Sequence, residues 1–119
     1  MSTITTVLTL FVALEFFYIL YLETFATTSK TTSKVFGLPK EELARPSVAT
    51  LFKNQGIYNG LLGVGLIYSL FSTNASLEIN RLILCYIILV AIYGSLTSNK
   101  KILFTQGGLA IVTLISTFF

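Results

Sequence analysis

The sequence contains no histidine, no tryptophan and a single cysteine, and only 11% of its 119 residues are charged. Without histidine, imidazole acid–base chemistry and the most frequent protein ligand for transition metals are both excluded. Cys85 has no partner for an internal disulfide and no second cysteine at metal-binding spacing. We interpret it as a small buried core residue. A metal site made of carboxylates alone stays open but has no support in the sequence, so we expect no metal and no other cofactor.

The low charge content also excludes an ordinary soluble surface. Soluble domains carry about 25% charged residues, whereas 54% of this chain is hydrophobic. The net charge of +3 does not indicate nucleic-acid binding, because the positions of the basic residues have another explanation, given below. Length and composition predict one integral membrane domain spanning residues 1–119.

Four apolar runs lie at about 4–25, 55–71, 79–96 and 102–119. Each is long enough to cross a hydrocarbon core of about 30 Å at 1.5 Å per residue. Helices are expected, since four short segments cannot close a barrel. No Lys or Arg precedes the first run, so we interpret it as a retained helix rather than a signal peptide. The predicted fold is all-α, a four-transmembrane-helix bundle with a long loop at 26–54.

The basic residues predict the orientation of this bundle. Of the 8 Lys and Arg residues, only Arg81 falls on the face that carries both termini. Both basic loops are therefore expected in the cytoplasm and both termini outside. The first part of the long loop, rich in Ser, Thr and Lys, is expected to be flexible, and "LPKEELARP" predicts a short helix between Pro39 and Pro46. The other basic residues are Lys30, Lys34, Lys40, Arg45, Lys53, Lys100 and Lys101.

Polar residues of all four runs fall in the same half of the predicted bilayer. A carboxylate near the centre of a span, such as Glu15, costs roughly 2.5–3.5 kcal/mol on insertion scales and normally faces a bundle interior. We expect a polar pocket open to the cytoplasm, with Glu15 at its floor as a proton or cation site. The predicted ligand-binding residues are Glu15, Tyr18, Glu23, Gln55, Tyr58, Asn59, Tyr93 and Gln106.

Structural roles for the same residues stay open. Glu15 could simply link helices through hydrogen bonds to Asn59, Tyr58 or Tyr18, and Glu23 could pair with Lys53 or Lys100. Tyr93 and Gln106 could likewise bond between helices. A stripe of small residues would let another helix approach closely; it consists of Gly56, Gly60 and Gly63.

Four segments, "ALEFFYILYLETF", "NQGIYNGLLGVGL", "AIYGS" and "KILFTQGGLA", resemble a bacterial family of small four-helix membrane proteins, classed as domain of unknown function 1304. The resemblance runs nearly end to end. It implies a multi-pass protein of the bacterial cytoplasmic (inner) membrane. Phe16 stands where the family often has histidine, and Thr27 lies near the place of a frequent tryptophan. An acid–imidazole mechanism is therefore doubtful here. The implied positions are Glu15, Tyr18, Tyr21, Glu23, Asn54, Gln55, Gly56, Tyr58, Asn59, Tyr93, Gly94 and Gln106.

Three functions fit these observations. The first is a binder or carrier of a small molecule, with Glu15 exchanging a proton or a cationic ligand. The second is an intramembrane enzyme acting on a lipid-like or quinone-like substrate through a glutamate and a tyrosine. The third is a structural or partner-binding membrane subunit. The partners considered are the lipid bilayer, a small-molecule or lipid-like ligand and a second copy of the chain in a homodimer, but no nucleic acid.

Overall fold

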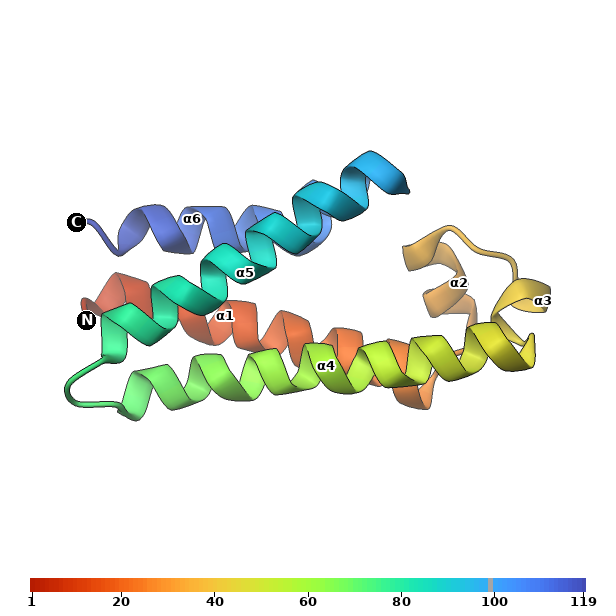
Figure 1. Ribbon diagram of the computed structural model, residues 1–119, viewed down its shortest axis with the longest axis horizontal. Coiled ribbons are helices and arrows are strands. Elements are labelled where there is room, and N and C mark those ends of the chain that lie inside the picture. Colours follow the sequence, from red (N-terminus) through yellow and green to blue (C-terminus); the bar gives the residue numbers. More distant parts are fainter. Residues whose placement is uncertain (99) are drawn as a thin grey trace. The chain divides into compact units, whose positions relative to one another are not determined.

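The computed structural model describes residues 1–98 and 100–119, and its regular structure in these residues is entirely helical. This confirms the predicted all-α class. Figure 1 shows the elements in chain order. They are α1 (Thr3–Leu20), the π-helical turn η1 (Tyr21–Phe25), α2 (Lys30–Phe36), α3 (Lys40–Leu43), α4 (Pro46–Phe71), α5 (Ser76–Thr97), the π-helical turn η2 (Leu103–Gly107) and α6 (Gly108–Ser116).

Within the described residues, two helical segments are long and apolar enough to cross a membrane. They are Thr3–Phe25, which joins α1 to η1 and has 23 residues, and α5, which has 22. The apolar helix Leu103–Ser116 is shorter, and α4 carries polar residues such as Gln55 and Asn59. Two such helices favour membrane association by length and composition, and the four-span bundle stays a prediction.

The segment between α1 and α4 is more ordered than its composition indicates. The Ser/Thr/Lys-rich part, expected to be flexible, forms α2. Ser29 caps this helix by accepting a hydrogen bond from the backbone N–H of Thr32 at 3.2 Å. Gly37 ends it in the left-handed conformation, at φ +66°, where a side chain would be strained. The expectation of a flexible segment is therefore wrong for these residues.

The short helix predicted in "LPKEELARP" is present as α3, which starts directly after Pro39. Pro46 does not close this part of the chain, however, because it opens α4. Proline suits a first helical position, where its missing N–H has no intrahelical partner to lose. As a result α4 is 26 residues long, and it starts well before the expected boundary at residue 55.

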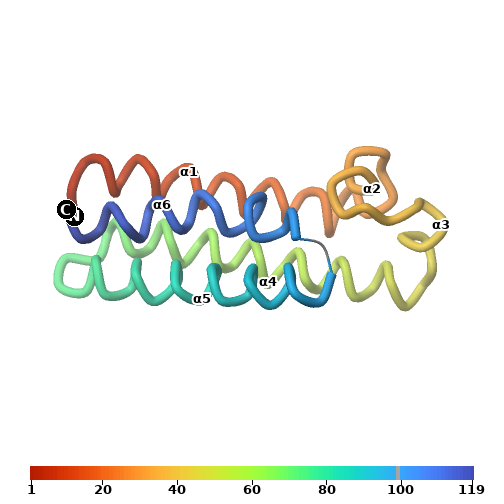
Figure 2. The backbone as a smooth tube through the Cα atoms, turned by 90° about the horizontal axis from the view of Figure 1, so that it is seen from above, coloured from red at the N-terminus to blue at the C-terminus, as the bar shows by residue number. Residues whose placement is uncertain are grey.

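The chain divides into two compact units, Met1–Glu15 with Val64–Phe119, and Phe16–Gly63. In the first unit α5 packs along η2 and α6. Figure 2 shows the start of α1 beside the end of α6, where the hydroxyls of Thr5 and Ser116 lie 2.9 Å apart. The buried core of this unit is formed by Val12, Ala13, Leu66, Leu84, Ile87, Ala91 and Ala110.

A buried polar network also stabilises the first unit. Asn80 on α5 is fully buried, and its Nδ2 donates to Thr9 Oγ1 at 2.9 Å and to Ser69 Oγ at 3.2 Å. These three side chains come from α5, α1 and α4, so one amide joins three helices. The first span of the predicted bundle is therefore held by specific bonds as well as by apolar packing.

The second unit is built from the end of α1, η1, α2, α3 and most of α4. Its buried apolar side chains are Phe16, Ile19, Leu22 and Leu43. Phe36 of α2 meets Phe52 of α4 edge to face, with ring centroids 5.2 Å apart. These contacts tie the α2–α3 segment to α4.

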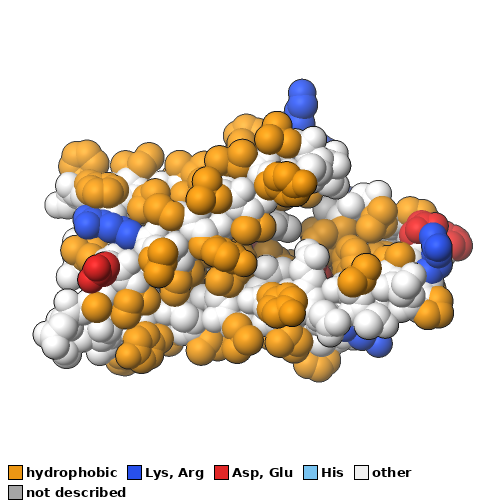
Figure 3. All heavy atoms as spheres, viewed as in Figure 1, with side chains coloured by type: hydrophobic (Ala, Val, Ile, Leu, Met, Phe, Trp, Pro, Cys, Tyr) orange, Lys and Arg blue, Asp and Glu red, His pale blue; other side chains and the backbone are white. Residues whose placement is uncertain are grey.

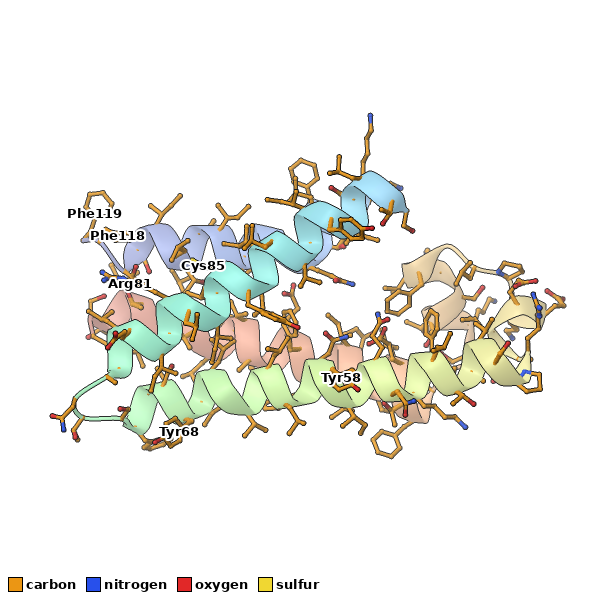
Figure 4. All side chains as sticks on the ribbon, in the orientation of Figure 1. Tyr58, Tyr68, Arg81, Cys85, Phe118 and Phe119 are labelled. Carbon is orange, nitrogen blue, oxygen red and sulfur yellow. The ribbon has the colours of Figure 1, made fainter. Side chains whose placement is uncertain are left out.

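Apolar side chains cover much of the face in Figure 3, and the few charged ones lie toward its margins. Leu82, Leu89 and Leu96 of α5 are all largely exposed. Cys85, which Figure 4 labels on the same helix, is exposed as well. The expectation that Cys85 lies in a protein core is therefore wrong. The apolar composition of a run does not tell which of its side chains the protein buries.

Candidate functional site

The best-defined polar cluster of the second unit surrounds the carboxylate of Glu23. This side chain is fully buried. Gln55 Nε2 donates to its Oε2 at 2.9 Å, and Asn59 Nδ2 donates to its Oε1 at 2.6 Å. Gln55 and Asn59 are four residues apart on α4, so both amides project from one face of the helix. One turn of α4 thus binds both oxygens of the carboxylate.

Glu23 owes its position to the π-helical turn η1. The backbone N–H of Ala26 bonds to the carbonyl of Tyr21 at 2.9 Å, five residues back rather than four. Such turns occur mostly as single insertions in α-helices and are frequent at functional sites. The wider turn changes the direction in which the following side chains leave the helix. Glu23 therefore does not follow the α-helical spacing of the residues before it.

Threonine hydroxyls donate hydrogen bonds to backbone carbonyl groups at this helix end. Thr27 Oγ1 donates to the Glu23 carbonyl at 2.7 Å. Thr32 Oγ1 lies within hydrogen-bond distance of two carbonyls, those of Leu22 at 3.1 Å and Ala26 at 2.6 Å. Both threonine side chains are buried. The α2 segment therefore helps to fix the backbone that carries Glu23.

Two glycines allow α4 to lie close to this turn. A Cβ atom built on Gly56 would lie 2.0 Å from Thr24 Oγ1, and one on Gly60 would lie 2.7 Å from Leu20 Cδ2. Thr24 Oγ1 itself donates to the carbonyl of Lys53 at 2.9 Å. Gly63, the third residue of the expected stripe, is buried. The close approach at Gly56 is what brings the amides on either side of it within reach of Glu23.

The remaining predicted site residues have different surroundings. Tyr18 and Tyr58 belong to the same unit as Glu23, but both are exposed, and neither ring hydroxyl bonds to the carboxylate. Glu15, Tyr93 and Gln106 belong to the other unit. The structure therefore brings together Glu23, Gln55 and Asn59 from the predicted set.

The partners of Glu15 and Glu23 differ from those considered from the sequence. Asn59 had been considered as a partner of Glu15, but it donates its hydrogen bond to Glu23. Lys53 or Lys100 had been considered as the partner of Glu23, but the side chains that donate to this carboxylate are Gln55 and Asn59. Glu15 is partly buried, and its Oε1 is buried without a hydrogen-bond partner among the described residues. The clearest arrangement of partners is thus around Glu23 rather than Glu15.

Sequence reasoning missed the hydroxyl groups that support the site, namely those of Thr24, Thr27 and Thr32. One signal was available. Ser29 precedes Thr32 by three residues, the spacing of an N-terminal helix cap, but the surrounding "TTSKTTSK" has the composition of a linker. The buried Asn80 was missed too, although an asparagine inside an apolar run is itself unusual.

Chemically, the cluster offers oxygen ligands to a small cation. The Glu23 carboxylate has free lone pairs besides the two that accept amide bonds, and each amide has a carbonyl oxygen. In the described part of the chain, no group of three or more His, Cys, Asp or Glu residues could hold a metal ion. The arrangement suits a proton or a monovalent cationic group better than a divalent metal, which prefers several carboxylates.

The fold and the cluster together define a small helical protein with membrane-compatible helices and one buried, amide-bonded carboxylate. The model of a family described as "Protein of unknown function (DUF1304)" matches residues 10–118, and the chain belongs to that family. It is 72% identical over 119 residues to "Uncharacterized protein YpaA" of Lactococcus lactis subsp. lactis (strain IL1403), and the match covers 100% of both chains. No solved structure matched the chain. The resemblance seen in the sequence is thereby confirmed.

Proposed function

We propose that this protein is a multi-pass protein of the bacterial cytoplasmic membrane that binds a small cationic molecule, or a proton, at Glu23. The observation that carries the proposal is a fully buried carboxylate whose hydrogen-bond partners are two neutral amides. In the part of the chain that the structure describes, no salt bridge from a Lys or Arg to Glu23 is found, whereas Glu42 pairs with Arg45.

The energetics of this carboxylate favour an exchangeable positive partner. Hydrogen bonds to a charged group contribute about 1.5–3 kcal/mol each. Burying one ion costs several kcal/mol even after relaxation. The two amide hydrogen bonds therefore roughly offset the free-energy cost of burying the charged carboxylate, with no large net stabilisation. A bound proton or cation would neutralise the charge and stabilise the buried form.

The distribution of charge supports the orientation that gives this site access. Apart from Arg81, the basic residues lie between η1 and the first turns of α4 or at residues 100 and 101, which favours a cytoplasmic position for both connections. In a four-span bundle, α4 and the segment η2–α6 supply the two further spans. Glu23 then lies near the cytoplasmic end of the segment Thr3–Phe25, with Gln55 exposed beside it. A ligand would enter from the cytoplasm.

A structural role for the same cluster is the second candidate. It is favoured by the close contacts of Gly56 and Gly60 with Thr24 and Leu20. On this view the amides and the carboxylate only fix the packing of α4 on η1. Interhelical hydrogen bonds in membranes contribute about 0.6 kcal/mol each, so such a cluster would change stability without binding anything.

Native mass spectrometry of the gently purified full chain separates these candidates. Wild type is compared with Glu23→Gln and with the control Glu42→Gln, which removes an exposed carboxylate. Each is titrated with ethylammonium chloride and sodium chloride as probes. We expect a small adduct on wild type and Glu42→Gln that Glu23→Gln lacks.

Helix stability, followed by circular dichroism, is measured on the same samples. A probe at about 100 times its dissociation constant should stabilise wild type by about 2.7 kcal/mol and leave Glu23→Gln unchanged. Identical adducts in all three proteins, with lower stability only in Glu23→Gln, would replace the binding proposal by the structural one.

A further inference from the structure

A second charged side chain, Arg81 in the other unit, has an unusual set of partners. Its Nε donates to Thr117 Oγ1 at 3.0 Å, and its Nη2 donates to the Thr117 carbonyl at 2.7 Å. The guanidinium carbon lies 4.2 Å from the centre of the Phe118 ring. Figure 4 shows Arg81 near the start of α5 and Phe118 just beyond α6, at the same end of this helix pair. All three partners of the guanidinium are uncharged.

No carboxylate neutralises Arg81 within the described residues. Glu78 lies three residues earlier on the same face of α5, but it is exposed and its carboxylate is not within 4.0 Å of the guanidinium. Arginine has five N–H donors, and the bonds to Thr117 use one on Nε and one on Nη2. Both N–H groups of Nη1 and the second of Nη2 stay available. They form an edge that can bind two oxygens of one anion.

The position of Arg81 identifies the class of anion. It lies at the sixth position of α5, whose 22 residues form one of the two segments able to span a membrane. That depth is about 7.5 Å along the helix from Ser76, where a long side chain reaches the phosphate layer of a bilayer. The exposed apolar residues Leu82 and Leu89 follow on α5 and would contact acyl chains.

We propose that Arg81 binds the phosphate group of a phospholipid at the end of the membrane that contains Ser76. Guanidinium groups bind phosphate through paired N–H donors. Thr117 and Phe118 hold the side chain in one conformation, which reduces the entropy lost when the lipid binds. This inference is independent of the Glu23 site, and it needs only that α5 spans the membrane.

The test measures binding of dioleoyl phosphatidylglycerol to the full chain in detergent by native mass spectrometry. The variants are Arg81→Gln and the matched control Arg45→Gln, whose arginine is already paired with Glu42 at 3.2 Å. We expect the dissociation constant for the lipid to rise about tenfold or more in Arg81→Gln and to stay unchanged in Arg45→Gln. Equal lipid binding by wild type and a helical Arg81→Gln would make Arg81 a clamp for α6 and nothing more.

Two further measurements keep the test decisive if Arg81→Gln folds poorly. Glu78→Gln leaves the contacts with Thr117 intact and removes a like charge near the phosphate, so lipid binding should tighten about twofold to fivefold. Unchanged or weaker binding in Glu78→Gln would overturn the proposal. Inorganic phosphate at millimolar concentration distinguishes the source of the anion. Bound lipid should not be displaced by inorganic phosphate. Displacement of the lipid by phosphate alone would point to a soluble phosphate ligand instead.

Discussion

The close approach of α4 to η1 predicts that Gly56→Ala destabilises the protein. The new methyl group would lie 2.0 Å from Thr24 Oγ1 and 3.1 Å from Glu23 Cβ. Overpacking of this kind costs about 1–3 kcal/mol. Rotating Thr24 away would remove its bond to the Lys53 carbonyl, at about 0.5–1.5 kcal/mol. Alanine recovers about 1 kcal/mol of helix propensity, so we expect a net loss of about 2 kcal/mol.

Gly108→Ala is the matched control for this substitution. A Cβ on Gly108 would meet nothing within 4 Å, and the residue has helical backbone angles. Only the propensity difference then acts, and it should stabilise the protein by about 1 kcal/mol. The two identical substitutions are therefore expected to change the free energy of unfolding in opposite directions.

The measurement is unfolding by sodium dodecyl sulfate titrated into a mild detergent, followed by the far-ultraviolet circular dichroism of the helices. Tryptophan fluorescence is excluded, since the chain has none. Thiol-reactive dyes are unsuitable, because Cys85 is exposed before unfolding. If Gly56→Ala is as stable as wild type, or shifts in the same direction as Gly108→Ala, the close packing of α4 on η1 is refuted.

Two other predictions concern the α2 segment. Thr32→Val removes a buried hydroxyl that bonds to the carbonyls of Leu22 and Ala26. The same denaturation assay should give a loss of about 1–3 kcal/mol, while the exposed neighbour Thr31→Val should have no effect; equal stabilities would show that the hydroxyl is dispensable. Lys34→Cys, introduced with Cys85→Ser, tests the orientation. A membrane-impermeant maleimide should label it only after the cells are opened, and labelling of intact cells would place this loop outside.

The helices themselves could be predicted from the sequence, but their partners could not. The apolar runs correctly predicted the helical class, and the proline positions predicted the short helix after Pro39. Hydropathy could not place Cys85, because apolar side chains occur on protein surfaces as well as in cores. The start of α4 was missed because the polar residues before Gln55 do not look like part of a span. Pro46 opens a helix as readily as it ends one.

The central residue of the site was missed for a different reason. Sequence reasoning placed Glu15 at the floor of the pocket because it lies near mid-span. The π-helical turn η1 interrupts the α-helical spacing of the first run at Glu23, so that spacing does not tell which side chains lie beside this carboxylate. Gln55 and Asn59 were both among the predicted ligand-binding residues, and their spacing of four residues puts them on one face of α4. Which carboxylate these two amides bind could not be predicted, because it depends on the π-helical turn.

The turn η1 also makes the length of this stretch as important as its composition. Removing one residue between Tyr21 and Phe25 would allow an ordinary α-helix to form there. The side chains of the turn itself, Glu23 among them, would then leave the helix in different directions. A protein could thus keep each polar residue of this family and still lose the buried carboxylate. In comparisons among relatives, a one-residue gap here would mark a change of architecture that percentage identity does not register.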